Sequence, residues 1–343
     1  MPTPLFAVYG ATGHTGRLVA AELLARGRDV VLSGRDETAL RALAGELAGP
    51  AEVHPAPLDD RAALRELADR AAVLIHCAGP FSVTGDPVAT AAVEAGCHYV
   101  DHAVESFHVR HLFEAYADRA EAAGIAMVPG LSFYGGLGDL LAAAVTDGLT
   151  DVERIVVGYS VRGWRLTTGA KNTAAQLFNE SERITFSGGA HHVGYVEPRN
   201  AVFAFPPPIG PRTMITPFPS CDIVTIPRHV PVRDLDLMLT AATFEEEGMF
   251  DSEDLDADAR ARSDFTVAVQ TVATPPGAAG HASGHDLWRM AALASVEGAV
   301  RLADGTGPRR RGVLAPAEAF PAEPFLRELE KLGALALTLR PGR

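Results

Sequence analysis

The first 130 residues alternate short apolar runs with segments whose apolar residues recur at helical spacing. The run Leu5–Tyr9 leads directly into the first such segment, residues 15–26, and the two patterns then repeat. This alternation is typical of a parallel, doubly wound sheet, because each strand returns through a right-handed helical crossover. The predicted strands are residues 5–9, 29–33, 52–58, 72–77, 99–101 and 125–128, and the predicted helices are residues 15–26, 37–47, 61–71, 87–95 and 104–123.

The pattern changes near residue 151, where apolar runs become separated by loops rich in proline and glycine. Runs divided in this way favour a mostly antiparallel sheet. The strands predicted here are residues 155–161, 184–187, 201–205, 221–226, 235–243 and 265–273. The acidic stretch 245–258 is predicted as a solvated loop and helix start, and helical spacing resumes from residue 285 and over 323–332.

The expected fold class is therefore α/β, in three parts. Residues 1–132 are predicted as a Rossmann domain that binds a dinucleotide. Residues 133–283 are predicted as a second α+β domain, with a mostly antiparallel sheet, for substrate binding and dimerisation. Residues 284–343 are predicted as a C-terminal segment whose helices return to the Rossmann domain.

Composition and charge restrict the classes of binding partner and the cellular compartment that we expect for this chain. No run of about 18 apolar residues occurs, so no membrane span is expected. No basic region precedes the first strand, so no signal peptide is expected either. Three widely spaced cysteines are typical of a reducing compartment, which favours the cytoplasm. A net charge of −13 argues against nucleic acid or anionic membrane as a partner.

The turn after the first strand reads Gly10-Ala11-Thr12-Gly13-His14-Thr15-Gly16 and opens the first helix. Gly10 permits the tight turn, Gly13 lets backbone approach a pyrophosphate, and Gly16 allows close packing of helix on strand. The helix N-terminus adds free N–H groups and a partial positive charge. The residues expected to bind the dinucleotide here are Gly10, Thr12, Gly13, His14, Thr15 and Gly16.

Three further strand ends complete the predicted cofactor site. The second strand ends in Ser33-Gly34-Arg35, where NAD enzymes carry a carboxylate and an arginine instead accommodates the 2′-phosphate of NADP. Arg35 therefore favours NADP, although an inward-facing Asp36 or an Arg35 that is only a surface charge would weaken this. The strand-end rule adds Asp59 near the adenine and Ala78-Gly79-Pro80-Phe81 near the centre of the cofactor.

Together with Gly96-Cys97-His98-Tyr99-Val100-Asp101, these motifs resemble the saccharopine dehydrogenase-like family of NADP-binding oxidoreductases. The resemblance continues at Gly284-His285-Asp286-Leu287-Trp288 and over residues 312–320, which are similar to the family's C-terminal segment. The resemblance implies a Rossmann fold with NADP as its cofactor. It is weak in the middle of the chain. Because the family includes saccharopine-forming, polyamine-forming and enoyl-reducing enzymes, it does not imply a substrate.

Two departures from the family fall where the nicotinamide is expected. The family usually follows its Tyr-x-Asp with a small residue and often Gly-Glu, whereas this chain reads Asp101-His102-Ala103-Val104-Glu105. Relatives often show Gly-Phe-Asp where this chain reads Ser132-Phe133-Tyr134-Gly135-Gly136-Leu137-Gly138-Asp139. Both stretches are expected to line the nicotinamide end.

The catalytic candidates are His102, Asp101 and Lys171. His102 and Asp101 end the fifth predicted strand, at the cofactor edge of the sheet, with Glu105 just beyond. His102 has the pKa range of a proton donor, or else it hydrogen-bonds backbone at the strand end. Asp101 either contacts substrate and nicotinamide or is structural. Lys171, one of two lysines, either offers a titratable amine or is a solvated surface residue.

Arginines of the second domain, Arg162 and Arg165, are candidates to anchor an anionic substrate, or are surface charges. No recognised zinc spacing occurs, so no metal is expected. None of the six tyrosines has a lysine four residues later, which excludes the Tyr–Lys proton relay of short-chain dehydrogenases.

The sequence thus predicts an NADPH-dependent reductase of a small imine or enoyl-type substrate, acting as a cytoplasmic homodimer. The alternative is a regulator that binds NADP without turnover, since fold alone does not decide function. A full second domain and a returning C-terminal segment favour the enzyme, because a sensor needs neither to bind the cofactor.

Overall fold

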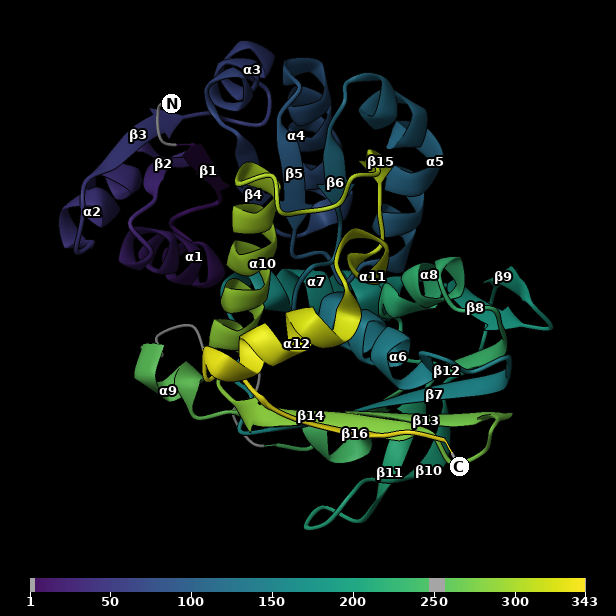
Figure 1. Cartoon of the computed structure of the whole chain (residues 1–343). Helices are drawn as coiled ribbons and strands as arrows, with labels where there is room; N and C mark the ends of the chain where they lie inside the picture. The colour runs from purple at the N-terminus through teal and green to yellow at the C-terminus, as the bar shows by residue number, and fades with distance from the viewer. Residues whose placement is uncertain (1–3, 247–256, 343) are drawn as a thin grey trace.

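Seven parallel strands form the N-terminal sheet, in the order β15-β6-β5-β4-β1-β2-β3 (Figure 1). The computed structural model describes residues 4–246 and 257–342. Strands β1 and β4 are neighbours, so the chain leaves them in opposite directions and opens a crevice between their ends. The strands are β1 (Leu5–Tyr9), β2 (Asp29–Gly34), β3 (Ala51–Pro55), β4 (Val73–His76), β5 (His98–Asp101), β6 (Ala126–Val128) and β15 (Gly312–Val313).

Helices cover both faces of this sheet. Along β1, Phe6 and Val8 belong to one buried cluster and Ala7 and Tyr9 to another, as expected for a strand buried on both sides. The first cluster includes side chains of α1 (His14–Ala25), α2 (Glu37–Glu46) and α10 (Leu287–Ala303). The second includes side chains of α3 (Arg61–Arg70), α4 (Phe81–Ala95) and α5 (Ser106–Ala122).

The second sheet has the order β10-β11-β12-β7-β13-β14-β16, with β8 paired to β12 and β9 to β8. Only β7 and β12 run parallel among its described pairings; the others are antiparallel. The strands are β7 (Asp151–Arg162), β8 (Arg183–Ser187), β9 (Ala190–Gly194), β10 (Arg199–Ala204), β11 (Pro211–Thr216), β12 (Val232–Thr240), β13 (Asp264–Thr274), β14 (Ala279–His285) and β16 (Ala336–Arg340).

The two sheets are joined by helices and by the C-terminal segment. Figure 1 shows α6 (Gly138–Thr146) and α12 (Ala322–Lys331) between the sheets, where α6 contacts β13, β14 and α12. Helix α10 packs against α1, so the C-terminal segment returns to the N-terminal domain as predicted. The segment then adds β15 to the first sheet beside β6 and β16 to the second beside β14. The predicted fold class is confirmed.

Several predicted elements differ from the structure. Residues 221–226 were expected as a strand but form helix α8 (Asp222–Thr225) and the start of a 3-10 turn. A short apolar run that is buried all round fits either element, so periodicity does not separate them. The third strand ends at Pro55 rather than at residue 58, which leaves Asp59 in an exposed turn.

The fourth helix begins at Phe81, six residues before the expected start at Pro87. A proline inside a helix leaves the carbonyl four residues earlier without its N–H partner. Here that carbonyl belongs to Val83, a residue that is 63% exposed. Of the acidic stretch 245–258, residues 247–256 lie outside the described residues, and helix α9 (Ala257–Ala261) follows them.

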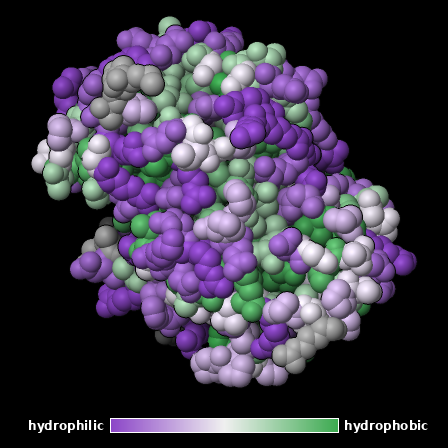
Figure 2. All heavy atoms as spheres, viewed as in Figure 1, coloured by the Kyte–Doolittle hydropathy of each residue, from purple (hydrophilic) through white to green (hydrophobic). Residues whose placement is uncertain are grey.

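On the face drawn in Figure 2, hydrophilic residues cover most of the N-terminal domain, and hydrophobic residues reach the surface in separate patches. Over residues 4–246 and 257–342, no helix has both the length and the apolar character needed to cross a bilayer.

Candidate active site

A cavity of about 690 Å³ lies between the N-terminal sheet and the second domain. The N-terminal domain contributes the glycine turn after β1 and the loops after β4 and β5. The second domain contributes the segment after β7, helix α7 (Thr168–Asn179) and the loop over residues 217–219. The cavity therefore sits at the crevice between β1 and β4, where doubly wound folds bind their ligands, and its volume is typical of a ligand pocket.

The glycine turn has the geometry that a dinucleotide needs. Gly10 has φ +79°, and a Cβ there would lie 2.7 Å from the Cβ of Ala78 in the loop after β4. A Cβ at Gly16 would lie 2.3 Å from the carbonyl oxygen of Gly10. Gly13 has extended backbone and no side chain caps the first turn of α1, while Thr12, Gly13, His14 and Thr15 line the cavity. The uncapped N–H groups at this helix start fit a pyrophosphate.

The end of β2 fits a 2′-phosphate. Arg35 is exposed, and within the described chain no carboxylate forms an ion pair with it. Asp36 does not compete, because its carboxylate caps α2 by accepting the Ala39 N–H at 3.0 Å. The Ser33 carbonyl accepts the N–H groups of Gly10 and Ala11, which ties the two strand ends together.

The loop after β4 lies against the glycine turn and the second domain. Ala78 touches Gly10, and Gly79 and Phe81 line the cavity. A Cβ at Gly79 would lie 3.1 Å from Thr173 Oγ1 of helix α7, so the second domain closes directly over this loop.

Asp101 is fully buried and its carboxylate accepts four hydrogen bonds. Oδ1 accepts the N–H groups of Ala103 at 3.0 Å and Gly130 at 2.7 Å, and Oδ2 accepts the Tyr99 hydroxyl at 3.0 Å and faces His108 Nε2 at 3.3 Å. Burial alone would raise the pKa of this carboxyl, but His108 and the two backbone N–H groups lower it overall. Asp101 does not line the cavity, and this geometry favours positioning the loop that carries His102.

His102 lines the cavity. Its Nδ1 lies 3.1 Å from the Ser132 hydroxyl, and its buried Nε2 has no hydrogen-bond partner among the described residues. Burial lowers its pKa to about 4, against an opposing effect of Asp101. The ring is therefore neutral near pH 7, so it can donate a hydrogen bond from Nε2 when Nδ1 accepts from Ser132, but it carries no acidic proton for the predicted transfer to substrate.

Glu105 also lines the cavity, at the start of α5. Its carboxylate accepts the Phe81 N–H at 2.9 Å and the Val104 N–H at 3.0 Å, and it lies 3.5 Å from Thr173 Oγ1. Burial raises its pKa, against the lowering effect of those backbone N–H groups. A buried carboxyl with a raised pKa is a further candidate for the proton donor, and the predicted catalytic set did not include it.

Aromatic side chains line one part of the cavity, called the chamber below. The Tyr134 ring lies 5.8 Å from that of Trp164 and 5.2 Å from that of Phe218. Trp164 lies 6.4 Å from Trp288, whose ring meets His14 of the glycine turn edge-on at 5.6 Å. Aliphatic residues form much of the remaining wall, and the arginines Arg183 and Arg260 also line it; the aliphatic residues are Leu166, Ala170, Ala174, Leu177, Ile215, Pro217 and Leu239.

Residues 6–128 match the family model of the saccharopine dehydrogenase NADP binding domain. The N-terminal domain belongs to that family. Its glycine turn, Arg35 and the loop after β4 are therefore parts of an NADP-binding domain, in agreement with the geometry above.

Sequence relatives match only part of the chain. A probable mitochondrial saccharopine dehydrogenase-like oxidoreductase of Arabidopsis thaliana is 30% identical over 148 residues, covering 38% of this chain and 33% of that protein. A trans-acting enoyl reductase of Mycobacterium ulcerans is 32% identical over 131 residues, covering 37% and 31%. The match thus spans about a third of the length of these relatives.

Over nearly its whole length the chain has the fold of the apo saccharopine dehydrogenase (L-Glu forming) from Saccharomyces cerevisiae. The TM-score is 0.67, with 98% of this chain and 99% of the yeast chain covered. The sequence identity is 11%, so this likeness concerns the fold alone.

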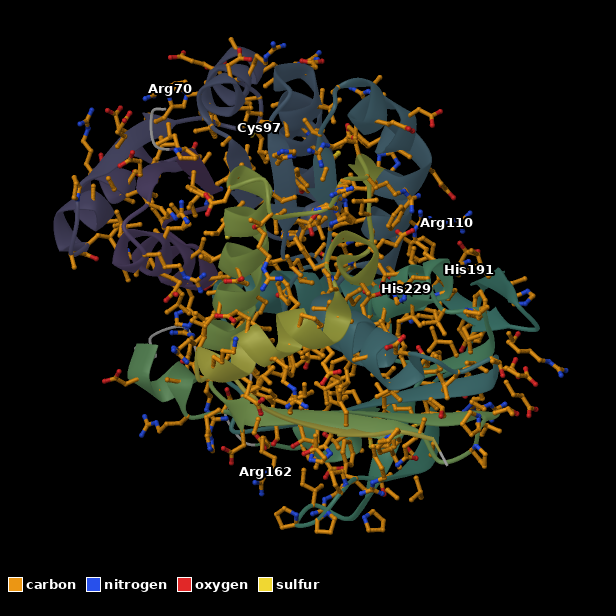
Figure 3. All side chains as sticks on the ribbon, in the orientation of Figure 1. Arg70, Cys97, Arg110, Arg162, His191 and His229 are labelled. Atoms are coloured by element: carbon orange, nitrogen blue, oxygen red, sulfur yellow. The ribbon has the colours of Figure 1, made fainter. Side chains whose placement is uncertain are left out.

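Three residues of the second domain that were predicted to act on the substrate or to bind it do not line the cavity. Lys171 is on helix α7 but does not line the cavity, whose lining from this helix consists of its neighbours. Arg162 extends to the outer side of the second sheet, where it pairs with Asp264 at 3.3 Å (Figure 3). Arg165 hydrogen-bonds the carbonyl of Trp164. Their roles toward substrate stay predictions.

Only the first part of the stretch 132–139 lines the cavity, through Ser132, Phe133 and Tyr134. Asp139 is fully buried elsewhere, where it faces His229 Nε2 at 2.7 Å and accepts the Ala317 N–H at 2.8 Å. His229, labelled in Figure 3, lies near α8 and the returning C-terminal segment. This contact fixes the C-terminal segment on α6 and does not take part in the site.

Proposed function

We propose that this chain is an NADPH-dependent reductase that transfers a hydride to a polarised C=C or C=N bond of a small substrate with an apolar body. One observation carries the proposal: a single cavity connects the NADP-binding loops to an aromatic chamber, with His102 and Glu105 on its wall. The names of the enoyl reductase and oxidoreductase relatives support the same reaction class.

NADPH, when bound, supplies the hydride. The residues of the chain then have separate tasks: the glycine turn and α1 hold the phosphates, and Arg35 binds the 2′-phosphate. The chamber excludes water and holds the apolar part of the substrate next to the nicotinamide, since hydride transfer needs the reacting carbon within about 3–3.5 Å. Glu105, whose pKa is raised by burial, is the proton donor that we favour, and His102, Asp101 and Lys171 stay predicted contributors.

Cofactor preference tests the first half of the proposal. NADPH is expected to bind the wild-type protein more tightly than NADH, and Arg35→Ala should remove roughly 10- to 150-fold of that preference, as for a lost charge-assisted contact. Arg41→Ala is the matched control, because Arg41 is an exposed arginine that pairs with Glu37 on α2. Fluorescence titration measures both. Equal affinities for NADPH and NADH in the wild type would contradict the assignment.

Turnover tests the second half. Oxidation of NADPH is followed with panels of conjugated enones and cyclic imines, and transfer of deuterium from labelled NADPH to product identifies the hydride acceptor. Binding of NADPH without turnover on either panel would favour the alternative, a non-catalytic NADP-binding regulator. Homodimerisation and cytoplasmic localisation stay predictions.

A further inference from the structure

The wall of the cavity carries more positive than negative side chains. Three arginines line it, Arg17, Arg183 and Arg260, and among the described residues the one carboxylate that lines it is that of Glu105. A dinucleotide bound here would bring negative phosphates, and this fold places the pyrophosphate at the glycine turn. Of the three arginines, Arg17 belongs to that turn, since it directly follows Gly16.

Arg17 occupies a position where a helix favours negative charge. Helix α1 begins at His14, so Arg17 lies in its first turn, and no acidic side chain occurs in that turn. The partial positive charge of a helix start repels a cation and attracts an anion. His14 adds no charge near pH 7, because burial, together with Arg260 and Arg17, lowers its pKa to about 4. Arg17 is therefore a full positive charge at a helix start, as expected where an anion binds.

Two contacts hold the guanidinium of Arg17 beside the glycine turn. Its Nε donates to the Thr12 carbonyl at 3.2 Å, and its Nη1 pairs with the Glu46 carboxylate of α2 at 2.6 Å. Its Nη2 has no hydrogen-bond partner in the part of the chain that the structure describes. The side chain is 42% exposed and lines the cavity, so a ligand can reach it. The two contacts thus fix a planar fork next to Thr12 and leave one nitrogen for a phosphate oxygen.

We propose that Arg17 binds the pyrophosphate of the dinucleotide, with its guanidinium held in place by the Thr12 carbonyl and Glu46; this rests on the cofactor half of the proposed function. The role differs from that of Arg35, which follows β2 and is proposed to bind the 2′-phosphate. The pyrophosphate is common to NADP and NAD. Arg17 therefore contributes affinity for both dinucleotides, whereas Arg35 contributes preference for one of them.

Ligands that differ in their phosphates test this inference without turnover. NADP⁺ carries both groups, NAD⁺ carries the pyrophosphate alone, and 2′-AMP carries the 2′-phosphate without a pyrophosphate. Isothermal titration calorimetry measures the affinity of each ligand for the wild type and for Arg17→Gln. The variant should bind NADP⁺ and NAD⁺ more weakly by the same factor, about 10-fold, as for one charge-assisted contact. Its affinity for 2′-AMP should be nearly unchanged.

Three further variants complete the comparison. Arg17→Lys keeps the charge but not the fork, so its affinities for NADP⁺ and NAD⁺ should lie between those of Arg17→Gln and the wild type. Arg35→Ala should give the complementary pattern, with weaker binding of NADP⁺ and 2′-AMP and unchanged binding of NAD⁺. Arg41→Gln is the matched control, because Arg41 is an exposed arginine of α2 that pairs with Glu37. It should change none of the three affinities.

Two outcomes would overturn the inference: an Arg17→Gln protein that binds all three ligands as the wild type does, or one that binds NADP⁺ and 2′-AMP more weakly but NAD⁺ normally, which would assign Arg17 to the 2′-phosphate. Circular dichroism checks the fold, and if Arg17→Gln does not fold, equal weakening of NADP⁺ and NAD⁺ in Arg17→Lys decides. Either failure leaves the reductase proposal in place. Failure of the wild type to bind NADP⁺ would overturn the proposed function itself, so the two failures are distinguishable.

Discussion

The three glycines of the first turn lie in different surroundings, although the sequence motif does not distinguish between them. A Cβ at Gly16 would lie 2.3 Å from the Gly10 carbonyl oxygen, a backbone atom that has no room to move. A Cβ at Gly13 would have one neighbour within 4 Å, the same oxygen at 3.3 Å, and the backbone there is extended. Folding and cofactor binding are therefore separable at single residues of this turn.

Gly13→Val should leave the protein folded and abolish NADPH binding, because the branched side chain would occupy the space that the pyrophosphate needs. The affinity is expected to fall by roughly 100-fold or more, as for the loss of several charge-assisted contacts. Circular dichroism checks the fold and fluorescence titration checks the affinity. Gly16→Ala is the contrasting variant, and overpacking there should cost about 1–3 kcal/mol of stability. A folded Gly13→Val protein with normal NADPH affinity would rule out this turn as the phosphate site.

Asp222 is predicted to make stability depend on pH. Burial raises its pKa to about 7, although the Ser220 and Tyr159 hydroxyls, the latter at 2.7 Å, donate to it and oppose the rise. A carboxyl with a raised folded-state pKa stabilises the fold below its unfolded pKa and loses that contribution as pH rises through 7. The free energy of unfolding of Asp222→Asn, relative to that of the wild type, should therefore be higher at pH 8 than at pH 4, by at most about 4 kcal/mol. Urea unfolding at both pH values measures this, and a constant difference would contradict it.

Sequence alone predicted the NADP side of the site better than the substrate side. Gly10, Arg35 and Ala78 follow parallel strands, and strand ends converge at one edge of a sheet regardless of what connects them. The chamber residues Trp164 and Phe218 come from segments distant in sequence, and no spacing relates them. Glu105 was within reach of the strand-end rule, but its burial under the Phe81 N–H was not visible in the sequence.

At the scale of elements, helix α7 joins the second domain to the cofactor-binding loop. Thr173 lies against Gly79 and 3.5 Å from the Glu105 carboxylate, and the Ser82 hydroxyl donates to Gln176 at 2.6 Å. These contacts are few and partly exposed, which is typical of an element that opens locally.

NADP⁺ is therefore expected to slow amide hydrogen exchange in α7. If opening of α7 exposes the cofactor site, saturation at about 100 times the dissociation constant should slow its exchange by up to roughly 100-fold. Helix α3, on the opposite face of the N-terminal sheet, is the internal control and should change little. Mass spectrometry of peptides from both helices makes the comparison. Equal protection of α3 and α7 would show that α7 does not close over the cofactor.

The elements that sequence reasoning missed share a physical cause. Strand β14 reads Ala-Gly-His-Ala-Ser-Gly-His, a composition without the branched residues that mark strands, and pairing with β13 and β16 makes it a strand. Helix α8 was taken for a strand because its apolar run is short and wholly buried. In both places tertiary contacts decide, and local pattern does not.

At the scale of the whole molecule, the C-terminal segment makes the two domains depend on each other. It packs α10 on α1, adds β15 to the first sheet, contacts α6 through α12 and adds β16 to the second sheet. The larger buried cluster is also continuous across this region, since it includes residues of both sheets. We therefore expect one cooperative unfolding transition rather than two.

Truncation after Gly333 removes β16 and should destabilise both domains together. Leu335 and Leu337 are 6% and 7% exposed, and burying two such side chains contributes about 3–6 kcal/mol. Truncation after Arg340 is the control, because it keeps β16 intact. Calorimetry of the three proteins should show single transitions, with a lower midpoint only for the shorter chain. Two separate transitions in the wild type would contradict the coupling.

Strands β15 and β16 are among the last parts of the chain to be synthesised, and this order affects folding during translation. A ribosome adds residues in chain order, so the glycine turn emerges about 270 residues before α10, the helix that packs on α1. Until then the apolar face of the nascent N-terminal domain lacks its cover, and exposed surface of this kind invites aggregation and chaperone binding. Dinucleotide binding is therefore expected to come after release from the ribosome, once residues 287–340 have closed both sheets.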